Sequence, residues 1–487
     1  MRRDRRGKRR SRYAAHHAGR GFFLHAGSAA RRLYLPRQRG HGNVPSPGLR
    51  FQRCGHPGGL FLVRRTGRAP DARELDHRAD RPLDSRPARP QDATEATGEN
   101  TMPVKNRFAE LQDEITAWRR DLHENPEILF ETHRTSAMVA DKLKAFGCDE
   151  IVTGIGRTGV VGVIKGKSDT SGKVIGLRAD MDALPIHEQT GLDYASKTDG
   201  AMHACGHDGH TAMLLGAAKY LAETRNFDGT VVVIFQPAEE GGGGGKEMCD
   251  DGMMDRFGVQ EVYGMHNWPG RPVGSFAIRP GAFFAAADQF DVILKGKGGH
   301  AAKPQETVDT TVLAAQTVMA LQTIASRNAD PVDQVVVSVT SFETSSKAHN
   351  VIPASVHLRG TVRTMSSEMR DLAEKRLTEI CEGTAATYGG TAEVQYHRGY
   401  PVMVNHEDQT EFAAEIATKV SGGCDTAPLV MGGEDFAYML EERPGAYILV
   451  GNGDTAMVHH PEYNFNDEAI PAGCSWWAEL VETRMPA

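Results

Sequence analysis

Three short apolar runs, each typical of a buried β-strand, precede side chains that can bind metal ions. The runs span residues 230–235, 260–265 and 446–450. The side chains that follow them are, in chain order, Glu239 and Glu240, then His266, then His459 and His460. Open α/β sheets build their sites at the carboxyl ends of strands. The pattern therefore predicts an α/β fold whose central sheet gathers these side chains at one edge.

The segments before these runs also alternate between helical and strand patterns. Apolar residues recur every three or four positions over 108–122, which predicts a helix, and a second helix is expected over 132–146. Short apolar runs at 160–165 and 174–179 predict further buried strands. Helical spacing resumes over 211–225. The succession of helices and strands again favours an α/β domain.

Residues 202–210 read Met-His-Ala-Cys-Gly-His-Asp-Gly-His and precede that last helix. Cys205 and His207 are therefore expected at a strand-to-helix turn, where a thiolate and an imidazole offer donors that transition metals favour. With a carboxylate of the glutamate pair, His266 and His459, they make five candidate ligands, which suits two metal ions. A site with two ions about 3.5–4 Å apart makes water a usable nucleophile near neutral pH.

The adjacent glutamates Glu239 and Glu240 admit two interpretations. Charged pairs are usually solvated, but this pair stands between an apolar strand and five consecutive glycines, residues 241–245. The chain is expected to turn sharply there, and glycine leaves room for a substrate or a metal to approach. One carboxylate could then bind metal while the other takes the proton of water and passes it to a leaving amine.

The segment between residues 288 and 400 follows a pattern of its own. Strands are expected near 290–295, 335–340, 356–362 and 392–397, with helices over 310–326 and 367–386. This β-α-β-β-α-β order is that of a ferredoxin-like fold. We therefore expect residues 102–287 and 402–487 to form one catalytic metal-binding domain, interrupted by a lid or dimerisation domain at 288–401.

The first 101 residues differ from the remainder in charge. Residues 1–100 hold 23 Lys+Arg and 9 Asp+Glu, a formal charge of +14, whereas the rest of the chain holds 33 and 54, a charge of −21. A basic head could bind nucleic acid or act as an organellar presequence. However, prolines and glycines are scattered through it without periodicity. We expect a disordered leader or upstream translation, an enzyme that begins at Met102, and no binding of nucleic acid.

The 7 cysteines are irregularly spaced and include no Cys-x-x-Cys pair. This is typical of a reducing compartment rather than of a disulfide framework, so a cytoplasmic location is expected. The chain has no uninterrupted apolar stretch of about 18 residues and no secretory signal pattern. We therefore expect no membrane span.

A series of motifs extends these observations across the chain. In order they are Arg178-Ala-Asp-Met-Asp-Ala-Leu-Pro185, Met202-His-Ala-Cys-Gly-His-Asp-Gly-His210, Gln236-Pro-Ala-Glu-Glu-Gly241, Met265-His266, Gly299-His300-Ala-Ala-Lys-Pro304, Asn350-Val-Ile-Pro353, Gly433-Glu-Asp-Phe436 and His459-His460-Pro461. Together they resemble the family of aminoacylases, hippurate hydrolases and indole-acetyl-amino-acid hydrolases. The resemblance covers about residues 102–487, and residues 1–101 have no counterpart in it.

The resemblance implies a zinc-peptidase-like α/β catalytic domain with a central mixed sheet and an inserted ferredoxin-like lid or dimerisation domain. It also implies that two metal ions are bound by Cys205, His207, Glu240, His266 and His459. Glu239 is then the general base and acid. The family's last ligand stands two residues before a proline, which selects His459 over His460.

Supporting roles follow from the same resemblance. Asp180 and Asp182 would orient the ligands through hydrogen bonds. His300 would reach across a dimer into the partner's site and stabilise the oxyanion, and Asn350 would contact substrate. Separately, Arg363 on a strand of the inserted domain could hold a substrate carboxylate through a charge-assisted fork, or be a surface arginine.

The sequence thus predicts a cytoplasmic, dinuclear metal-dependent amidohydrolase that cleaves N-acyl amino acids such as hippurate-like and N-acetyl compounds. Its ligands admit manganese, zinc, nickel or cobalt. A homodimer or a higher homo-oligomer is expected. Two alternatives stay open: a dipeptidase or carboxypeptidase of the same architecture, and a metal-binding relative without turnover. A closed structural zinc site is disfavoured, because the ligands are dispersed along the chain and include a carboxylate.

Overall fold

The computed structural model describes residues 105–487, which belong to one compact unit. The predicted leader lies outside these residues. Among the described helices, none combines the length and apolar character needed to cross a bilayer. The helices outside the inserted segment are α1 (Asn106–Glu124), α2 (His133–Phe146), α3 (His207–Thr224), α4 (Gly244–Asp250), α5 (Met253–Arg256), α8 (Glu407–Ser421), α9 (Ala437–Glu442) and α10 (Ile470–Arg484).

A mixed 8-stranded sheet lies at the centre of the α/β part, with strand order β1-β2-β4-β3-β5-β16-β6-β15. The strands are β1 (Glu150–Ile155), β2 (Gly159–Lys165), β3 (Val174–Asp180), β4 (Thr230–Gln236), β5 (Glu261–Trp268), β6 (Phe276–Ile278), β15 (Cys424–Thr426) and β16 (Gly445–Gly451). Strands β4, β3, β5 and β16 are neighbours that pair in parallel, so their carboxyl ends meet at one edge. The α/β fold with a central mixed sheet is confirmed.

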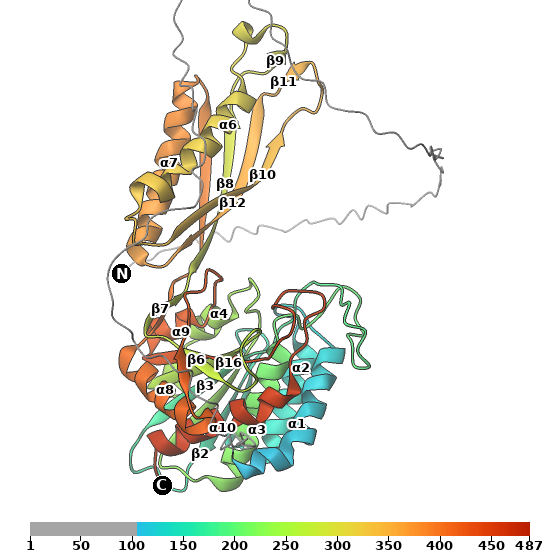
Figure 1. The fold of residues 1–487 in the computed structure, drawn as a ribbon, viewed down its shortest axis with the longest axis vertical. Coiled ribbons are helices and arrows are strands. Elements are labelled where there is room, and N and C mark those ends of the chain that lie inside the picture. The colour runs from blue at the N-terminus through green and yellow to red at the C-terminus, as the bar shows by residue number, and fades with distance from the viewer. Residues whose placement is uncertain (1–104) are drawn as a thin grey trace, which may run out of the picture. The chain divides into compact units, whose positions relative to one another are not determined.

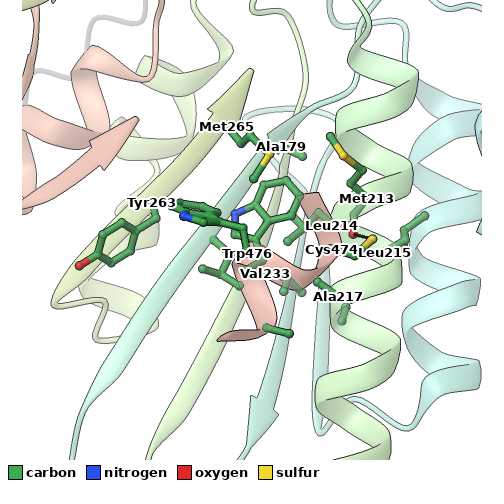
Figure 2. Packing of buried hydrophobic residues seen from close by; sticks show 14 of the residues in the cluster. Ala179, Met213, Leu214, Leu215, Ala217, Val233, Tyr263, Met265, Cys474 and Trp476 are labelled. Atoms are coloured by element: carbon green, nitrogen blue, oxygen red, sulfur yellow. Dashed lines mark hydrogen bonds between the residues drawn. The ribbon is translucent and has the colours of Figure 1, made fainter. Parts of the chain in front are cut away.

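Helices cover both faces of this sheet (Figure 1). In β4, Val233 packs into the core with α1, α3 and α10, whereas its neighbour Val232 packs into the opposite core with α4 and α9. Apolar residues at successive positions are what a strand buried on both faces requires. Figure 2 shows Trp476 of α10 and Met213 of α3 packed over the strands. Burying large apolar side chains such as these stabilises a fold by about 1.5–3 kcal/mol each.

The inserted segment, residues 286–400, forms a second sheet of 4 strands in the order β10-β12-β8-β13. Its elements are β8 (Ala286–Lys295), α6 (Thr310–Leu321), β10 (Val335–Thr344), β12 (Ser355–Thr364), α7 (Ser367–Thr387) and β13 (Thr391–Tyr400). Buried and more exposed residues alternate along β8, because one face of this sheet packs against α6 and α7 (Figure 1). The segment therefore has a hydrophobic core of its own.

Two short strand pairs complete the structure. β7 (Gly281–Phe284) pairs with β14 (Met403–Asn405), so the chain is anchored both where it enters and where it leaves the inserted segment. β9 (Gly299–His300) pairs with β11 (Val351–Ile352). The proposed domain limits at residues 288 and 401 fall inside β8 and directly after β13.

Some sequence-based boundaries were wrong. β5 does not end before His266 but continues to Trp268, because its residues 262–268 pair with β16. The helix expected over 310–326 ends at Leu321 and is followed by a turn of π-helix, Ile324–Asn328. Residues 181–206 separate β3 from α3, so the expected strand-to-helix turn is the end of a long loop.

Candidate metal centre

Gly206 directs the two residues on either side of it into the site. Its φ is 90°, and a Cβ at this position would lie 2.3 Å from Asn267 Nδ2 and 2.4 Å from the Tyr463 hydroxyl. Only glycine accommodates both the left-handed backbone and the close neighbours. The turn allows the chain to present Cys205 immediately before α3 and His207 as the first residue of that helix, both buried.

The structure brings the five predicted ligands together. Cys205, His207 and His266 offer ligand atoms within 4.8 Å of one another, and Cys205, Glu240 and His459 do the same. Cys205 Sγ lies 3.3 Å from His266 Nε2, and His459 Nε2 lies 3.3 Å from Glu240 Oε1. The two overlapping groups form a donor set of sulfur, nitrogen and oxygen that suits transition metals.

Two buried atoms of this cluster, His207 Nε2 and Glu240 Oε1, make no hydrogen bond within the described part of the chain, although His459 Nε2 lies 3.3 Å from Glu240 Oε1. His207 Nδ1 lies 2.9 Å from the main-chain oxygen of Asp182, an arrangement that fixes the ring and leaves Nε2 as the ligand atom. A buried polar atom without a partner costs about 1–3 kcal/mol. A divalent cation would satisfy both atoms, so the residues present fit a metal.

The buried carboxylates and the thiol of the cluster would also be stabilised by a nearby positive charge. Burial and the nearby Glu240 raise the pKa of the Cys205 thiol well above its usual value, so a thiolate needs a cation beside it. Burial lowers the pKa of His207, but Asp180 and Asp182 raise it, and the result is a pKa of about 10.

Asp180 and Asp182 hold the site from outside the ligand cluster. The Asp182 carboxylate accepts hydrogen bonds from the main-chain N–H groups of Glu239, at 2.9 Å, and Glu240, at 3.1 Å. Asp180 Oδ1 lies 2.6 Å from His210 Nδ1, and its other oxygen lies 3.8 Å from His207 Nε2. These contacts fit the orienting roles expected of the two residues.

Arg178 is a fully buried charge to which sequence reasoning gave no role. Its guanidinium lies 2.7 Å from Asp180, 3.1 Å from Glu434 and 3.0 Å from Asp435. Oxygens of Glu434 and Asp435 in turn lie within 4.8 Å of a Glu239 oxygen. Burial and Glu434 raise the pKa of Glu239 well above its usual value. An arginine inside the apolar run of β3 was the sequence signal for this network, because buried charges need partners.

The chain turns sharply at the glycines after Glu240, as expected, and at Gly244 the fold itself requires a glycine. A Cβ on Gly244 would lie 1.7 Å from the main-chain oxygen of Pro237 and 3.4 Å from Ala238 Cβ. The loop therefore folds back on the end of β4, and glycine is required by the chain itself. Of these glycines, only Gly241 is among the residues that line the pocket beside the metal ligands.

That pocket has a volume of about 550 Å³. Its lining includes Glu239 and four of the five candidate ligands, namely Cys205, Glu240, His266 and His459. Apolar lining comes from Trp268, Phe284, Val430 and Val458, and the remaining polar lining from Gln289, Arg363, His397, Arg398, Tyr400 and Glu434. The site therefore offers apolar and cationic surfaces beside the candidate metal ligands.

The remaining predicted site residues divide into two groups. Arg363 lines the pocket, half-buried, and donates to the main-chain oxygens of Asp288 and Val362. His300 and Asn350 are exposed, and neither lines the pocket. Both belong to the β9–β11 region, where His300 pairs with Val351.

Comparison with known proteins agrees with these motifs and this geometry. Hippurate hydrolase of Campylobacter jejuni is 41% identical, over 76% of this chain and 97% of that protein. Thermostable carboxypeptidase 1 of Saccharolobus solfataricus is 40% identical, over 72% and 88%. The crystal structure of the Bacillus subtilis YXEP protein, a dinuclear metal binding peptidase from the M20 family, matches with a TM-score of 0.69 and 36% identity, over 77% and 99%. Residues 176–483 match the family described as peptidase family M20/M25/M40, and the chain therefore belongs to that family.

Proposed function

We propose that this protein hydrolyses the amide bond of N-acyl amino acids and releases a carboxylic acid and a free amino acid. The observation that carries the proposal is the convergence of five potential metal ligands and one further carboxylate, Glu239, beside a single pocket. Two divalent cations, whether manganese, zinc, nickel or cobalt, would when bound polarise the amide carbonyl and lower the pKa of water.

In this proposal Glu239 moves the protons of the reaction. It lines the pocket, is 7% exposed, and is oriented through the hydrogen bond between its main-chain N–H and Asp182. Its carboxylate would take a proton from the attacking water and give it to the amide nitrogen as the C–N bond breaks. Proton transfer of this kind contributes about 10²–10⁴-fold to turnover.

The pocket lining suggests how the two ends of such a substrate are held. The rings of Trp268 and Phe284 meet edge to face, with centroids 6.4 Å apart, and offer an apolar surface to the acyl group. Arg363 would pair with the carboxylate of the amino acid through its guanidinium. An aroyl group such as the benzoyl of hippurate would use this apolar surface more fully than an acetyl group would.

His300 and Asn350 are proposed to act in a homodimer or a higher homo-oligomer. Both are exposed and stand outside the pocket of their own chain. In this proposal they enter the partner's site, where His300 stabilises the oxyanion and Asn350 contacts substrate. The cytoplasmic location and the lack of a nucleic-acid partner remain predictions from the sequence.

The carboxypeptidase relative favours a second candidate function, the cleavage of peptides. A kinetic panel distinguishes the two. The protein, reconstituted separately with each of the four metals, would be assayed on N-benzoylglycine, N-acetyl amino acids and dipeptides with a free α-amine. We expect kcat/KM at least about tenfold higher for the best N-acyl amino acid, because the apolar lining disfavours an ammonium group. Preference for dipeptides would support the peptidase, and no hydrolysis would support a binding protein.

A further inference from the structure

The loop that carries the two glutamates is strained and is held at several points. Ala238 has a φ of 55°, which non-glycine residues rarely adopt. On one side of the loop, the Asp182 carboxylate accepts the main-chain N–H groups of Glu239 and Glu240. A backbone conformation of this kind persists only where its surroundings enforce it.

The other side of the loop is held by the hydroxyl group of Tyr400. This hydroxyl donates to the main-chain oxygen of Glu239, at 2.6 Å. It accepts hydrogen bonds from the main-chain N–H groups of Gly241, at 2.9 Å, and Gly243, at 3.1 Å. One donor and two acceptor sites are all that a hydroxyl offers, so the group is saturated by the loop. Although Tyr400 lines the pocket, its hydroxyl has no hydrogen-bonding capacity left for substrate.

Tyr400 reaches the loop from a distant part of the chain. It is the last residue of β13, and 161 positions separate it from Glu239. Its ring packs edge to face against Tyr438, with centroids 6.1 Å apart. The inserted segment thus ends in a residue that fixes residues 238–243, the glutamate loop.

We propose that Tyr400 is a positioning residue for Glu239, whose hydroxyl fixes the peptide groups around Glu239 so that the carboxylate faces the pocket. This inference rests on the proposed function, in which Glu239 transfers a proton from the attacking water to the leaving amide nitrogen. It assigns Tyr400 no contact with the reacting atoms. A misplacement of a catalytic group by about 1 Å can cost 10²-fold in rate.

The test replaces Tyr400 with phenylalanine, which removes only the hydroxyl. Because Tyr400 lines the pocket, water can reach the groups that lose their partner, and the Tyr400→Phe variant is expected to fold. We expect kcat to fall at least about tenfold, KM to change less than about twofold, and metal content to stay at the wild-type level. A smaller fall in kcat, or a loss of metal, would overturn the inference.

Tyr438→Phe is the matched control. Tyr438 is also half-buried at this junction, and its hydroxyl donates to the main-chain oxygen of Gly399, at 3.1 Å, not to the glutamate loop. Its removal should leave kcat within about twofold of wild type, since it removes one tyrosine hydrogen bond at the same junction without freeing Glu239. If kcat of Tyr438→Phe also fell tenfold, the loss in Tyr400→Phe would be explained by general destabilisation, and the inference would be overturned.

A double variant separates this inference from the proposed function. If Tyr400 acts through Glu239, Tyr400→Phe should cause less than about a twofold further loss in a Glu239→Gln background. Full additivity would overturn the inference. Wild-type activity of Glu239→Gln alone would instead contradict the proposed function. A dead Glu239→Gln variant beside an unimpaired Tyr400→Phe variant would leave the proposed function standing and reject only the role of Tyr400.

Discussion

Cys205 Sγ lies 3.3 Å from His266 Nε2, although the two residues stand 61 positions apart in the chain. Cys205 lies at the end of the loop of residues 181–206 before α3 and His266 lies within β5, so only tertiary packing brings them together. Both side chains are buried. A thiol and an imidazole at this distance, with His207 and Glu240 beside them, form groups that could hold a metal ion.

Replacing Cys205 with alanine should lower the metal content of the protein, because the residue belongs to both overlapping ligand groups. Elemental analysis of the purified variant is expected to give clearly fewer than two equivalents. Cys249→Ala is the control, since Cys249 of α4 is similarly buried but packs in an apolar core. Two full equivalents in the Cys205 variant would refute the assignment of this residue as a ligand.

Replacing Glu239 with glutamine should separate turnover from metal binding. The amide keeps the size of the carboxylate but accepts no proton, so kcat is expected to fall at least about a hundredfold. Metal content should stay near the wild-type value, because the proposed ligand is the neighbouring Glu240. Glu462→Gln, at an exposed position, controls for the charge change. Unchanged turnover in the Glu239 variant would exclude the acid-base role.

His123 should make the stability of the protein depend on pH. Its Nδ1 lies 2.8 Å from Asp208 and its Nε2 lies 3.3 Å from Glu188. Burial lowers the pKa of His123, but these two carboxylates raise it from 6.5 to about 9 in the folded state. Because the folded-state pKa exceeds the unfolded value, the stabilisation is complete below 6.5 and is lost as the pH rises through about 9.

The measurement is urea unfolding of the wild type and of His123→Gln at several pH values. The difference in free energy of unfolding should shrink by up to about 3 kcal/mol between about pH 6 and about pH 10. His133→Gln, at an exposed histidine, should show no such trend. A difference that does not vary with pH would contradict the proposed charge state of His123.

A chain that begins at Met102 should retain full activity. The first described helix, α1, begins at Asn106, and its buried residues pack in the core with α3 and α10. The basic segment before Met102 has a composition that does not favour a core of its own. Thermal unfolding and kcat/KM of the truncated protein should equal those of the full chain. Failure of the truncated protein to fold would overturn the interpretation of residues 1–101 as a leader.

The repeated placement of Glu239, Glu240, His266 and His459 after apolar runs was enough to predict an α/β sheet with its site at one edge. Strand and helix patterns are local properties, and the periodicity of apolar residues records which faces are buried. The resemblance carried by the motifs predicted membership of the family, which the comparisons confirmed. It also implied ligands that the structure places together.

The sequence alone could not find Tyr400, the partners of Arg178 or the reason for the glycines after Glu240. Tyr400 reaches Glu239 across 161 positions, and Arg178 joins Asp180 to Glu434 and Asp435. Such contacts leave no periodic signal, because they depend on how the packed sheets and loops place distant residues. Local sequence thus determined the elements and the chemistry at their ends, and only tertiary packing decided which hydrogen bonds and charges surround that chemistry.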